Sequence, residues 1–400
     1  MAKRGGREMT EFERRTDDFI RFIRGMYGDA FIPLHRPIFA GNERQYLVDV
    51  IDCNFVSSVG QGVIDFENMV AEYTGAKYAV ATVNGTAALH TALVLAGVSQ
   101  GDEVLSQPLT FIATCNAISY TQARPVFIDV DKDTMGMSPK ALQEWLDAHT
   151  EQVGGYCTNI GTGAIIRACV PMHTFGLPLR IKEISKICAA HNIVLIEDAA
   201  ESLGSFVGEI HTGNFGAMAT LSFNGNKVIT TGGGGMLITN DEALAKRAKH
   251  ITTTAKVLHP YEFVHDEVGY NYRLPNLNAV LGVAQMEMLP AMQAIKNNVT
   301  AAYESYCAEN GWALVKPIEG MRANNWLNAI RLQTPNERED FIKQTNAAGV
   351  MTRPIWRLMN ELEMFKNCQT DGVKTAKWLE ERIVNISSSV PDSKIESLSL

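Results

Sequence analysis

The stretch Ile193-Val-Leu-Ile-Glu-Asp-Ala-Ala200 opens with four apolar residues, mostly β-branched, and then reaches two acids. A short apolar run of this kind is typical of a strand that is buried on both faces of a parallel sheet. We therefore predict a central strand that ends at Asp198. Open α/β sheets bind ligands in the crevice outside the carboxyl ends of their strands, so Asp198 is a candidate site residue.

The sequence downstream of this strand presents a lone lysine. A second strand is predicted at residues 219–223, and it leads through Asn224-Gly-Asn226 to Lys227. Four glycines follow, Gly232 to Gly235, before another β-type run at residues 236–239. A dinucleotide-binding glycine turn must open a helix. Because a strand follows here, we interpret the glycines as a hairpin or tight turn.

Asp198 and Lys227 together meet the two requirements of pyridoxal phosphate chemistry. That cofactor needs an amine to hold it as a Schiff base, and a carboxylate to keep its ring nitrogen protonated so that the ring can accept electrons. Each residue alone has a simpler explanation. An Asp at a strand end is more often a helix cap or loop partner, and a lysine in a loop is usually solvated. The hypothesis therefore depends on the combination.

Three motifs relate this combination to a known family. Glu197-Asp198-Ala199-Ala200, Ser222-Phe223-x-x-x-Lys227 and Gly269-Tyr270-Asn271-Tyr272-Arg273 resemble the DegT/DnrJ/EryC1/StrS family of sugar aminotransferases. The resemblance covers residues 32–390. It implies fold type I of the pyridoxal enzymes and a transaminase that uses pyridoxal 5'-phosphate, with pyridoxamine 5'-phosphate as the intermediate form.

The order of elements predicts the fold class independently. Strand patterns at 78–82, 102–106, 125–129 and 164–171 alternate with helical patterns at 87–96, 108–118 and 181–191. This alternation predicts an α/β fold with a large, doubly wound, mostly parallel sheet. We assign residues 35–275 to this pyridoxal-phosphate-binding domain, residues 1–34 to an N-terminal helical extension, and residues 276–400 to a linking helix and a smaller α+β C-terminal domain.

Some segments carry weaker signals. Residues 252–268 show no regular pattern, and a segment of this length is commonly functional or disordered. Pro290 predicts a kink or break in the helical pattern at 277–308. The polar tail after Ser387 is expected to fray.

The resemblance also implies further site residues. Gly85 and Thr86 stand where a strand turns into a helix, a junction whose free N–H groups suit a phosphate, although Asn and Thr also cap helices that bind nothing. With Ser222 they are expected to hold the cofactor phosphate. Phe111 is expected to stack on the cofactor ring, and Asn271 to reach the phosphate of a neighbouring subunit in a homodimer with shared active sites.

Two expectations are less direct. His173 matches the family's His-x-x-Gly turn and is expected to line the active site, although a His after a strand is most often structural. Glu201 stands where most family members have Gln beside the phenolic oxygen of the cofactor. A carboxylate there either points elsewhere or accepts a proton from the phenol.

Composition limits the kinds of partner. The 400 residues carry a formal net charge of −8, which disfavours nucleic acid or an anionic membrane surface. The seven cysteines never form C-x-x-C, so no metal site is predicted, and an odd number fits a reducing cytoplasm. No apolar core follows the basic N-terminal residues, and no run of about eighteen apolar residues occurs. We expect a soluble cytoplasmic enzyme.

The substrate is inferred from the branch of the family. Residues 55–60, 352–356 and 385–388 and the N-terminal helix look like the LegC-type branch. That branch implies glutamate as donor and a UDP-linked 4-keto-6-deoxy-N-acetylhexosamine as acceptor, aminated at C4 for a legionaminic-type sugar of lipopolysaccharide or another surface glycan. A GDP- or dTDP-linked ketosugar is the alternative. Positive groups that could face its diphosphate are Arg353, Arg357, Lys256 and His259, each of which is equally consistent with a solvated surface.

Two other classes on the same fold fit less well. The related sugar dehydratases replace the lysine by histidine, and Lys227 argues against that chemistry. A regulator built on this fold would carry a DNA-binding module, for which the chain shows no basic domain.

Overall fold

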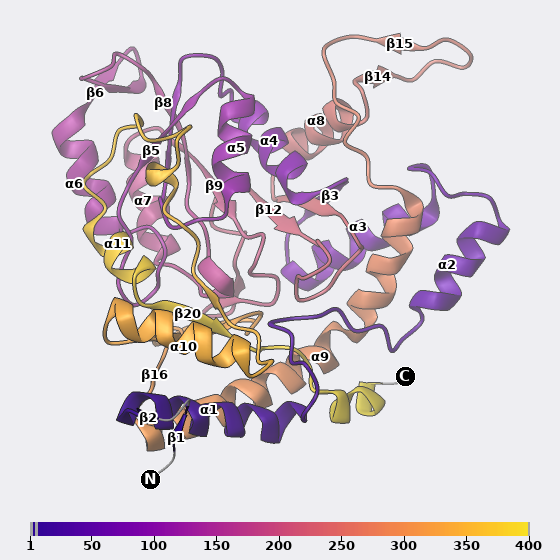
Figure 1. Cartoon of the computed structure of the whole chain (residues 1–400). Helices are drawn as coiled ribbons and strands as arrows, with labels where there is room; N and C mark the ends of the chain where they lie inside the picture. The colour runs from indigo at the N-terminus through magenta and orange to yellow at the C-terminus, as the bar shows by residue number, and fades with distance from the viewer. Residues whose placement is uncertain (1–2, 5–6, 399–400) are drawn as a thin grey trace.

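A seven-stranded sheet forms the centre of the molecule in the computed structural model, which describes residues 3–4 and 7–398 (Figure 1). The strand order is β3-β13-β12-β9-β8-β4-β5, and every neighbouring pair is parallel except those made by β13. The bounds are β3 Tyr78–Thr82, β4 Glu103–Ser106, β5 Arg124–Phe127, β8 Ile166–Val170, β9 Val194–Asp198, β12 Met218–Ser222 and β13 Gly235–Thr239. The predicted α/β class and mostly parallel sheet are confirmed.

Helices cover both faces of this sheet. One face packs against α4 (Gly85–Leu95), α5 (Ile112–Tyr120) and α8 (Glu242–Thr252), and the other against α6 (Pro139–His149) and α7 (Ile181–Ala190). Strand β4 shows why both faces are apolar, because Val104 packs in the first layer and its neighbour Leu105 in the second. Adjacent side chains of a strand point to opposite faces. The sheet is therefore doubly wound, as predicted.

The sequence analysis missed α6 and the exposed hairpin that follows it, β6 (Thr150–Val153) with β7 (Tyr156–Asn159). The helix did carry a start signal, since the Ser138 hydroxyl caps it by accepting from the Ala141 N–H and Pro139 occupies its first turn. The hairpin strands are largely polar and exposed, so they have no apolar pattern to read.

A second, four-stranded antiparallel sheet lies at the C-terminal end, in the order β16-β18-β20-β19. Its elements are β16 (Ala313–Leu314), β18 (Asn328–Arg331), β19 (Arg353–Pro354) and β20 (Ile383–Ile386), with helices α10 (Pro335–Ala347) and α11 (Lys374–Glu380). Helix α1 (Glu11–Tyr27) packs into the same core, where Phe19 contacts Tyr303, Trp312 and Phe341. The proposed domain boundaries at residues 34/35 and 275/276 stay predictions.

Helix α9 (Asn276–Asn310) joins the two sheets. It packs against α2 (Glu43–Asp52) and α3 (Gln61–Thr74) near its start and against β16 near its end (Figure 1). The helix is continuous through Pro290, so of the two predicted effects the break is wrong, and the kink stays a prediction.

Smaller elements complete the fold. They are the pair β1 (Lys3–Arg4) and β2 (Arg7–Glu8), a three-stranded sheet of β10 (Phe206–Val207), β11 (Ile210–His211) and β17 (Met321–Arg322), and the short 3-10 helices Thr174–Gly176, Met359–Glu361 and Asp392–Leu398. Among the helices of the described residues, none has the length and apolar character needed to span a membrane.

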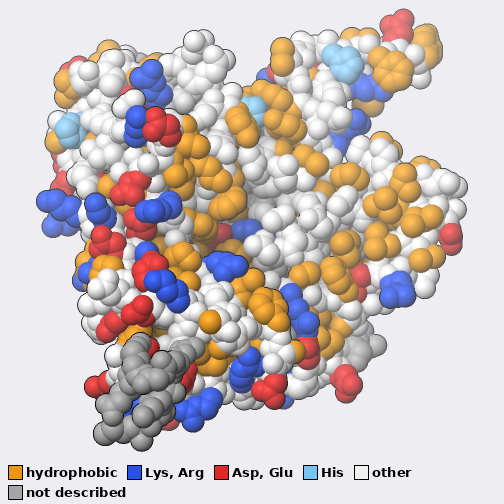
Figure 2. Space-filling view, in the orientation of Figure 1, with side chains coloured by type: hydrophobic (Ala, Val, Ile, Leu, Met, Phe, Trp, Pro, Cys, Tyr) orange, Lys and Arg blue, Asp and Glu red, His pale blue; other side chains and the backbone are white. Residues whose placement is uncertain are grey.

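Residues 252–268, predicted to be irregular, contain a two-stranded hairpin of β14 (Lys256–Val257) and β15 (Val264–His265). It projects from the body of the molecule (Figure 1) and exposes Leu258, Tyr261 and Phe263. A second exposed apolar surface lies on α2 and the loop after it, visible as the orange side chains over α2 in Figure 2. We call this the α2 surface and define it by Val48, Ile51, Phe55, Val56 and Val59.

The first residues of the polar tail are buried rather than frayed as predicted, and residues 399–400 at its end lie outside the described residues. Ser387, Ser388 and Ser389 are buried, and the Tyr303 hydroxyl donates to the Ser387 carbonyl at 2.8 Å. Buried Lys296 donates to the Ser388 carbonyl. These serines directly follow strand β20 and are held in the core by those hydrogen bonds, which a polar segment on the surface would lack.

The packing of α1 leads to the first prediction. Phe19→Ala should lower the free energy of unfolding by about 3–5 kcal/mol, because it leaves a cavity among Tyr303, Trp312 and Phe341. Chemical denaturation followed by circular dichroism measures the loss. The control Phe31→Ala, at a side chain 64% exposed, should stay within about 0.5 kcal/mol of the wild type. Equal midpoints for the two variants would show that α1 contributes nothing to the core.

Candidate active site

Seven of the residues expected at the site line one cavity of about 570 Å³. They come from the carboxyl ends of neighbouring strands and the loops that follow, because β9 ends at Asp198, β12 ends at Ser222, and β3 leads into α4. The seven are Gly85, Thr86, Phe111, Asp198, Glu201, Ser222 and Lys227. Residues far apart in sequence thus meet where a parallel sheet gathers its strand ends.

Asp198 is a buried carboxylate without a cationic side chain in ion-pair contact among the described residues. The Thr114 hydroxyl donates to its Oδ2 at 2.6 Å, and the Ala200 N–H donates to Oδ1 at 3.2 Å. Burial raises the pKa of Asp198, and these two donors only partly oppose that effect. A protonated ring nitrogen in the cavity would supply the missing positive partner, so Asp198 fits the pyridine end of pyridoxal phosphate.

Lys227 lies in the loop between β12 and β13, and its Nζ forms an ion pair with Glu201 Oε1 at 3.1 Å. The other carboxylate oxygen, Oε2, accepts the Phe175 N–H at 2.9 Å. Phe175 adopts a left-handed backbone conformation, φ 57°, which is costly for a residue with a side chain. Burial raises the pKa of Glu201, and the charge of Lys227 opposes that rise.

An indole ring, which the sequence analysis did not connect with the site, covers Lys227. Nζ lies 4.3 Å from the centroid of the Trp326 ring, and the Trp326 Nε1–H donates to the carbonyl of Asn226 at 2.7 Å. The ring therefore contacts both the amine and the backbone just before it. A cation held over an indole face is stabilised by the ring quadrupole.

Trp326 is itself fixed by a buried network. Its N–H donates to Asn324 Oδ1 at 3.0 Å, and Asn324 Nδ2 donates to the Glu201 carbonyl at 2.7 Å. Lys296 Nζ donates to the Trp326 carbonyl at 3.2 Å, and burial lowers the pKa of Lys296 to about 7. Asn324 and Trp326, just before strand β18 of the second sheet, thus contact both Lys227 and the backbone of Glu201. Nothing in the spacing of these residues could have revealed the network.

The opposite end of the cavity suits a phosphate. Gly85 and Thr86 begin α4, whose first-turn N–H groups have no partner within the helix, and Asn84 caps that turn by accepting from the Ala87 N–H at 2.8 Å. A Cβ on Gly85 would lie 3.0 Å from the Cβ of Ser222. The absence of that Cβ lets the helix terminus and the Ser222 hydroxyl face the same space.

The glycine run explains how this end is closed. A Cβ on Gly235 would lie 2.4 Å from backbone atoms of Asn84, which would push β13 away from the start of α4. Because β13 is the strand that brings the chain back from Lys227 to β3, this close approach keeps the lysine loop near the phosphate end. Gly235 therefore serves a strand packed against the α4 turn, and the glycine run leads into a strand rather than a helix, unlike a dinucleotide fingerprint.

Phe111 precedes α5 and remains 49% exposed inside the cavity. Its ring centroid lies 6.3 Å from that of Trp356, which in turn lies 4.9 Å from Phe175. A half-exposed phenylalanine in a cavity leaves one face available for a flat ring, so its expected stacking role stays a prediction consistent with this position.

The structure does not bring His173 or Asn271 to the surface of this cavity. His173 is fully buried, accepts the Leu179 N–H at its Nδ1 (3.3 Å), and faces Glu197 Oε2 through Nε2 at 3.0 Å. Asn271 is exposed, and its Oδ1 accepts from the Arg273 guanidinium at 3.3 Å. Contact of His173 with the cofactor and contact of Asn271 with a partner's cofactor stay predictions.

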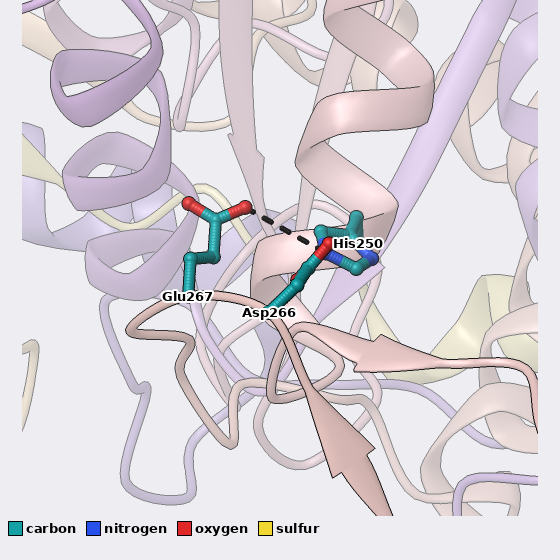
Figure 3. Close-up of side chains that lie close together, drawn as sticks. All are labelled: His250, Asp266 and Glu267. Carbon is teal, nitrogen blue, oxygen red and sulfur yellow. Dashed lines mark hydrogen bonds and ion pairs between the residues drawn. The ribbon is translucent and has the colours of Figure 1, made fainter.

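Three further residues of metal-binding type, His250, Asp266 and Glu267, gather at the base of the β14–β15 hairpin (Figure 3). His250 Nε2 lies 2.7 Å from Asp266 Oδ1 and 3.6 Å from Glu267 Oε1. The Arg247 guanidinium also pairs with both oxygens of Glu267. Because arginine already balances this carboxylate, we interpret the cluster as an ion-paired anchor between α8 and the hairpin.

Comparison with known proteins agrees with a pyridoxal phosphate site in this cavity. The model of the DegT/DnrJ/EryC1/StrS aminotransferase family matches residues 37–394. The chain is 34% identical to GDP-perosamine synthase of Caulobacter vibrioides, over 86% of this chain and 90% of that protein. It is also 34% identical to the putative pyridoxal phosphate-dependent aminotransferase EpsN of Bacillus subtilis, over 84% of each chain.

Solved structures share the fold. The putative sugar aminotransferase Spr1654 of Streptococcus pneumoniae, in its PMP form, superposes with a TM-score of 0.81 at 20% identity, over 92% of this chain and 97% of that one. The same protein has a PLP-form structure, with a TM-score of 0.80. The chain therefore belongs to the DegT/DnrJ/EryC1/StrS aminotransferase family and is a pyridoxal phosphate-dependent aminotransferase of nucleotide sugars.

Proposed function

We propose that this enzyme transfers the amino group of glutamate to C4 of a nucleotide-linked 4-keto-6-deoxy sugar, with a UDP-linked 4-keto-6-deoxy-N-acetylhexosamine as the first candidate. The observation that carries the proposal is the convergence of Lys227, Asp198 and the start of α4 on one cavity. The segments at 55–60, 352–356 and 385–388 that resemble the LegC-type branch support the UDP-linked sugar. The product would serve a legionaminic-type or related surface glycan.

A GDP-linked 4-keto-6-deoxy sugar is the second candidate. The relatives named GDP-perosamine synthase favour it, including those of Caulobacter vibrioides and Escherichia coli O157:H7, each 34% identical to this chain. Both candidates present an uncharged ketone at the same ring carbon, so they differ only in the base and in the substituents of the sugar.

Each residue of the cavity has a separate role in this proposal. Pyridoxal phosphate supplies an aldehyde that carries the amino group between substrates and a ring that accepts electrons. The Asp198 carboxylate would keep the ring nitrogen protonated. Lys227 Nζ would move the proton between the reacting carbon of each substrate and the aldehyde carbon of the cofactor, and Glu201, whose Oε1 lies 3.1 Å from that amine, would hold it in position. The first turn of α4 and the Ser222 hydroxyl would bind the phosphate.

The chemistry leads to a prediction about Lys227. Borohydride should fix the cofactor covalently on Lys227, as found by peptide mapping, and Lys227→Ala should bind the cofactor without covalent attachment. Its turnover should fall by about 10⁴-fold or more, because the variant loses the attachment point and the proton carrier together. Lys246→Ala, on the exposed side of α8, should keep both properties. A reduced adduct on any other lysine would contradict the assignment.

The substrate prediction separates the two candidates. With glutamate as donor and mass spectrometry as readout, the UDP-linked ketosugar should give the highest kcat/KM and pyruvate or oxaloacetate the lowest. A higher value for the GDP-linked sugar would transfer the proposal to the second candidate. If simple 2-oxo acids exceeded both nucleotide sugars, the sugar substrate would be wrong even though the cofactor chemistry stood.

We also infer a homodimer with shared active sites. Asn271 is exposed and outside its own chain's cavity, as a residue that serves a partner would be. The α2 surface supplies exposed apolar side chains of the kind that association buries.

Subunit mixing tests the shared sites. Lys227→Ala and Asn271→Ala subunits should each be poorly active alone, and their mixture should recover activity. In the heterodimer one site contains both defects and the other contains neither. Native mass spectrometry verifies that the subunits exchange. Exchange without recovered activity would mean that each chain builds its own site.

A further inference from the structure

Glu201 is the acid that forms an ion pair with the Lys227 amine among the described residues. The Glu201 side chain is 2% exposed and that of Lys227 is 12% exposed, so bulk water has little access to either group. Oε1 lies 3.1 Å from Nζ, which is a hydrogen-bond distance. A proton can therefore pass from the amine to the carboxylate without leaving the cavity.

The surrounding backbone fixes this carboxylate. The Phe175 N–H donates to Oε2 at 2.9 Å, and Asn324 Nδ2 donates to the Glu201 carbonyl at 2.7 Å. The turn that contains Phe175 packs closely on the same asparagine, since a Cβ on Gly176 would lie 2.0 Å from Asn324 Oδ1. Both the backbone and one side-chain oxygen of Glu201 are thus held, and Oε1 is left to face Lys227.

The charge of Glu201 depends on a single cation. Burial, the largest effect, raises the pKa of Glu201, the positive charge of Lys227 opposes that rise, and the negative charge of Asp198 adds to it. The neighbouring segments contribute neutral groups, the Phe175 N–H and the Asn324 amide. The carboxylate is therefore favourable while Lys227 is an ammonium and unfavourable when it is not.

Attachment of the cofactor removes this ammonium. The nitrogen of Lys227 must first lose a proton, because an ammonium has no lone pair with which to attack an aldehyde. Once the nitrogen is bonded to the cofactor, Glu201 no longer faces an ammonium, and a buried carboxylate without a cation is costly. One event thus releases a proton and leaves a carboxylate that needs one.

We propose that Glu201 accepts the proton that Lys227 loses when it attaches to the cofactor, and that Glu201 stays protonated while the cofactor is attached. The proposal rests on Lys227 as the attachment point, as proposed above. Glutamine, which most family members have at this position, could not take this proton, so the role belongs to this chain rather than to the family.

The step balances within the cavity. One proton moves from Nζ to Oε1, and the nitrogen lone pair then forms a bond to the aldehyde carbon. The C=O bond breaks as the C=N bond forms, and the aldehyde oxygen leaves as water with the two remaining Nζ protons. No proton is exchanged with the solvent.

The test follows the attachment of pyridoxal 5'-phosphate to the apoenzyme by stopped-flow absorbance across the neutral pH range. In the wild type, a neutral amine beside a protonated carboxyl holds as many protons as the resting ion pair, so its population does not depend on pH. In Glu201→Gln the proton must go to water. The rate of this variant relative to the wild type should therefore rise about tenfold per pH unit. Ionisation of the cofactor itself affects both rates equally and cancels in the ratio.

Proton counting is an independent measurement. In weakly buffered solution with a pH indicator, the wild type should release about one proton fewer per attached cofactor than Glu201→Gln. The two are compared at a pH where their attached forms have the same absorption spectrum. Glu201→Ala, a second variant without a carboxyl group, should behave as Glu201→Gln in both measurements.

Three controls separate proton transfer from positioning. Glu201→Asp keeps a carboxyl group, so its rate relative to the wild type should be constant with pH. Trp326→Phe loses the hydrogen bond to the lysine loop, and its effect on the rate should also be constant with pH. Glu242→Gln removes an exposed glutamate that pairs with Lys246 outside the cavity, and it should match the wild type in both measurements.

Either of two results would overturn the proposal. They are a rate ratio for Glu201→Gln that does not change with pH, and equal proton release by the wild type and this variant. In both cases Glu201 would only position the amine. Failure of the underlying assignment is seen separately, because borohydride would then fix the cofactor of the wild-type enzyme on a lysine other than Lys227.

Discussion

A carboxylate buried at the end of a central strand is the constraint on which the site depends. Asp198 has one hydroxyl and one N–H as donors and no ion-pair partner among the described residues, so burial raises its pKa in the free chain. Its charge becomes favourable only when a cation occupies the cavity. The order of the strands then places the other site residues. Strand β12 pairs with β9, so the loop that carries Lys227 begins beside Asp198, and β13 pairs with β3, which leads to the phosphate end of the cavity.

Sequence alone predicted the site residues that lie at or just after the end of a strand with a clear apolar pattern. The strand ending at Asp198 opens with four apolar residues, and Lys227 follows a strand at a spacing typical of the family, so both could be placed without coordinates. Both residues line one cavity with Gly85, Thr86 and Ser222. His173 shows the limit, because a histidine after a strand can face either the cavity or the layer beneath, and here it faces Glu197.

The contacts that sequence could not predict are those made across the two sheets. Trp326 is a single aromatic residue before a short strand, and its role depends on the 4.3 Å separation between its ring and Lys227 Nζ. Asn324 joins the backbone of Trp326 to that of Glu201, over a separation of more than a hundred residues in sequence. The prediction that the tail after β20 frays was wrong at these serines for the same reason. Polar composition does not reveal that Tyr303 and Lys296 donate hydrogen bonds to the carbonyls of Ser387 and Ser388.

The cavity must serve two substrates in turn, and its division between the sheets shows how one site can do so. The large sheet contributes Asp198, Lys227 and the start of α4 to the cavity, the groups that the proposed chemistry needs for both substrates. The second sheet and its flanking segments contribute a mostly apolar wall with one charged side chain, Arg353. Trp326 links the two parts, because its ring lies over Lys227 Nζ and its indole N–H donates to the Asn226 carbonyl of the lysine loop, so the position of the amine depends on the second sheet as well as the first.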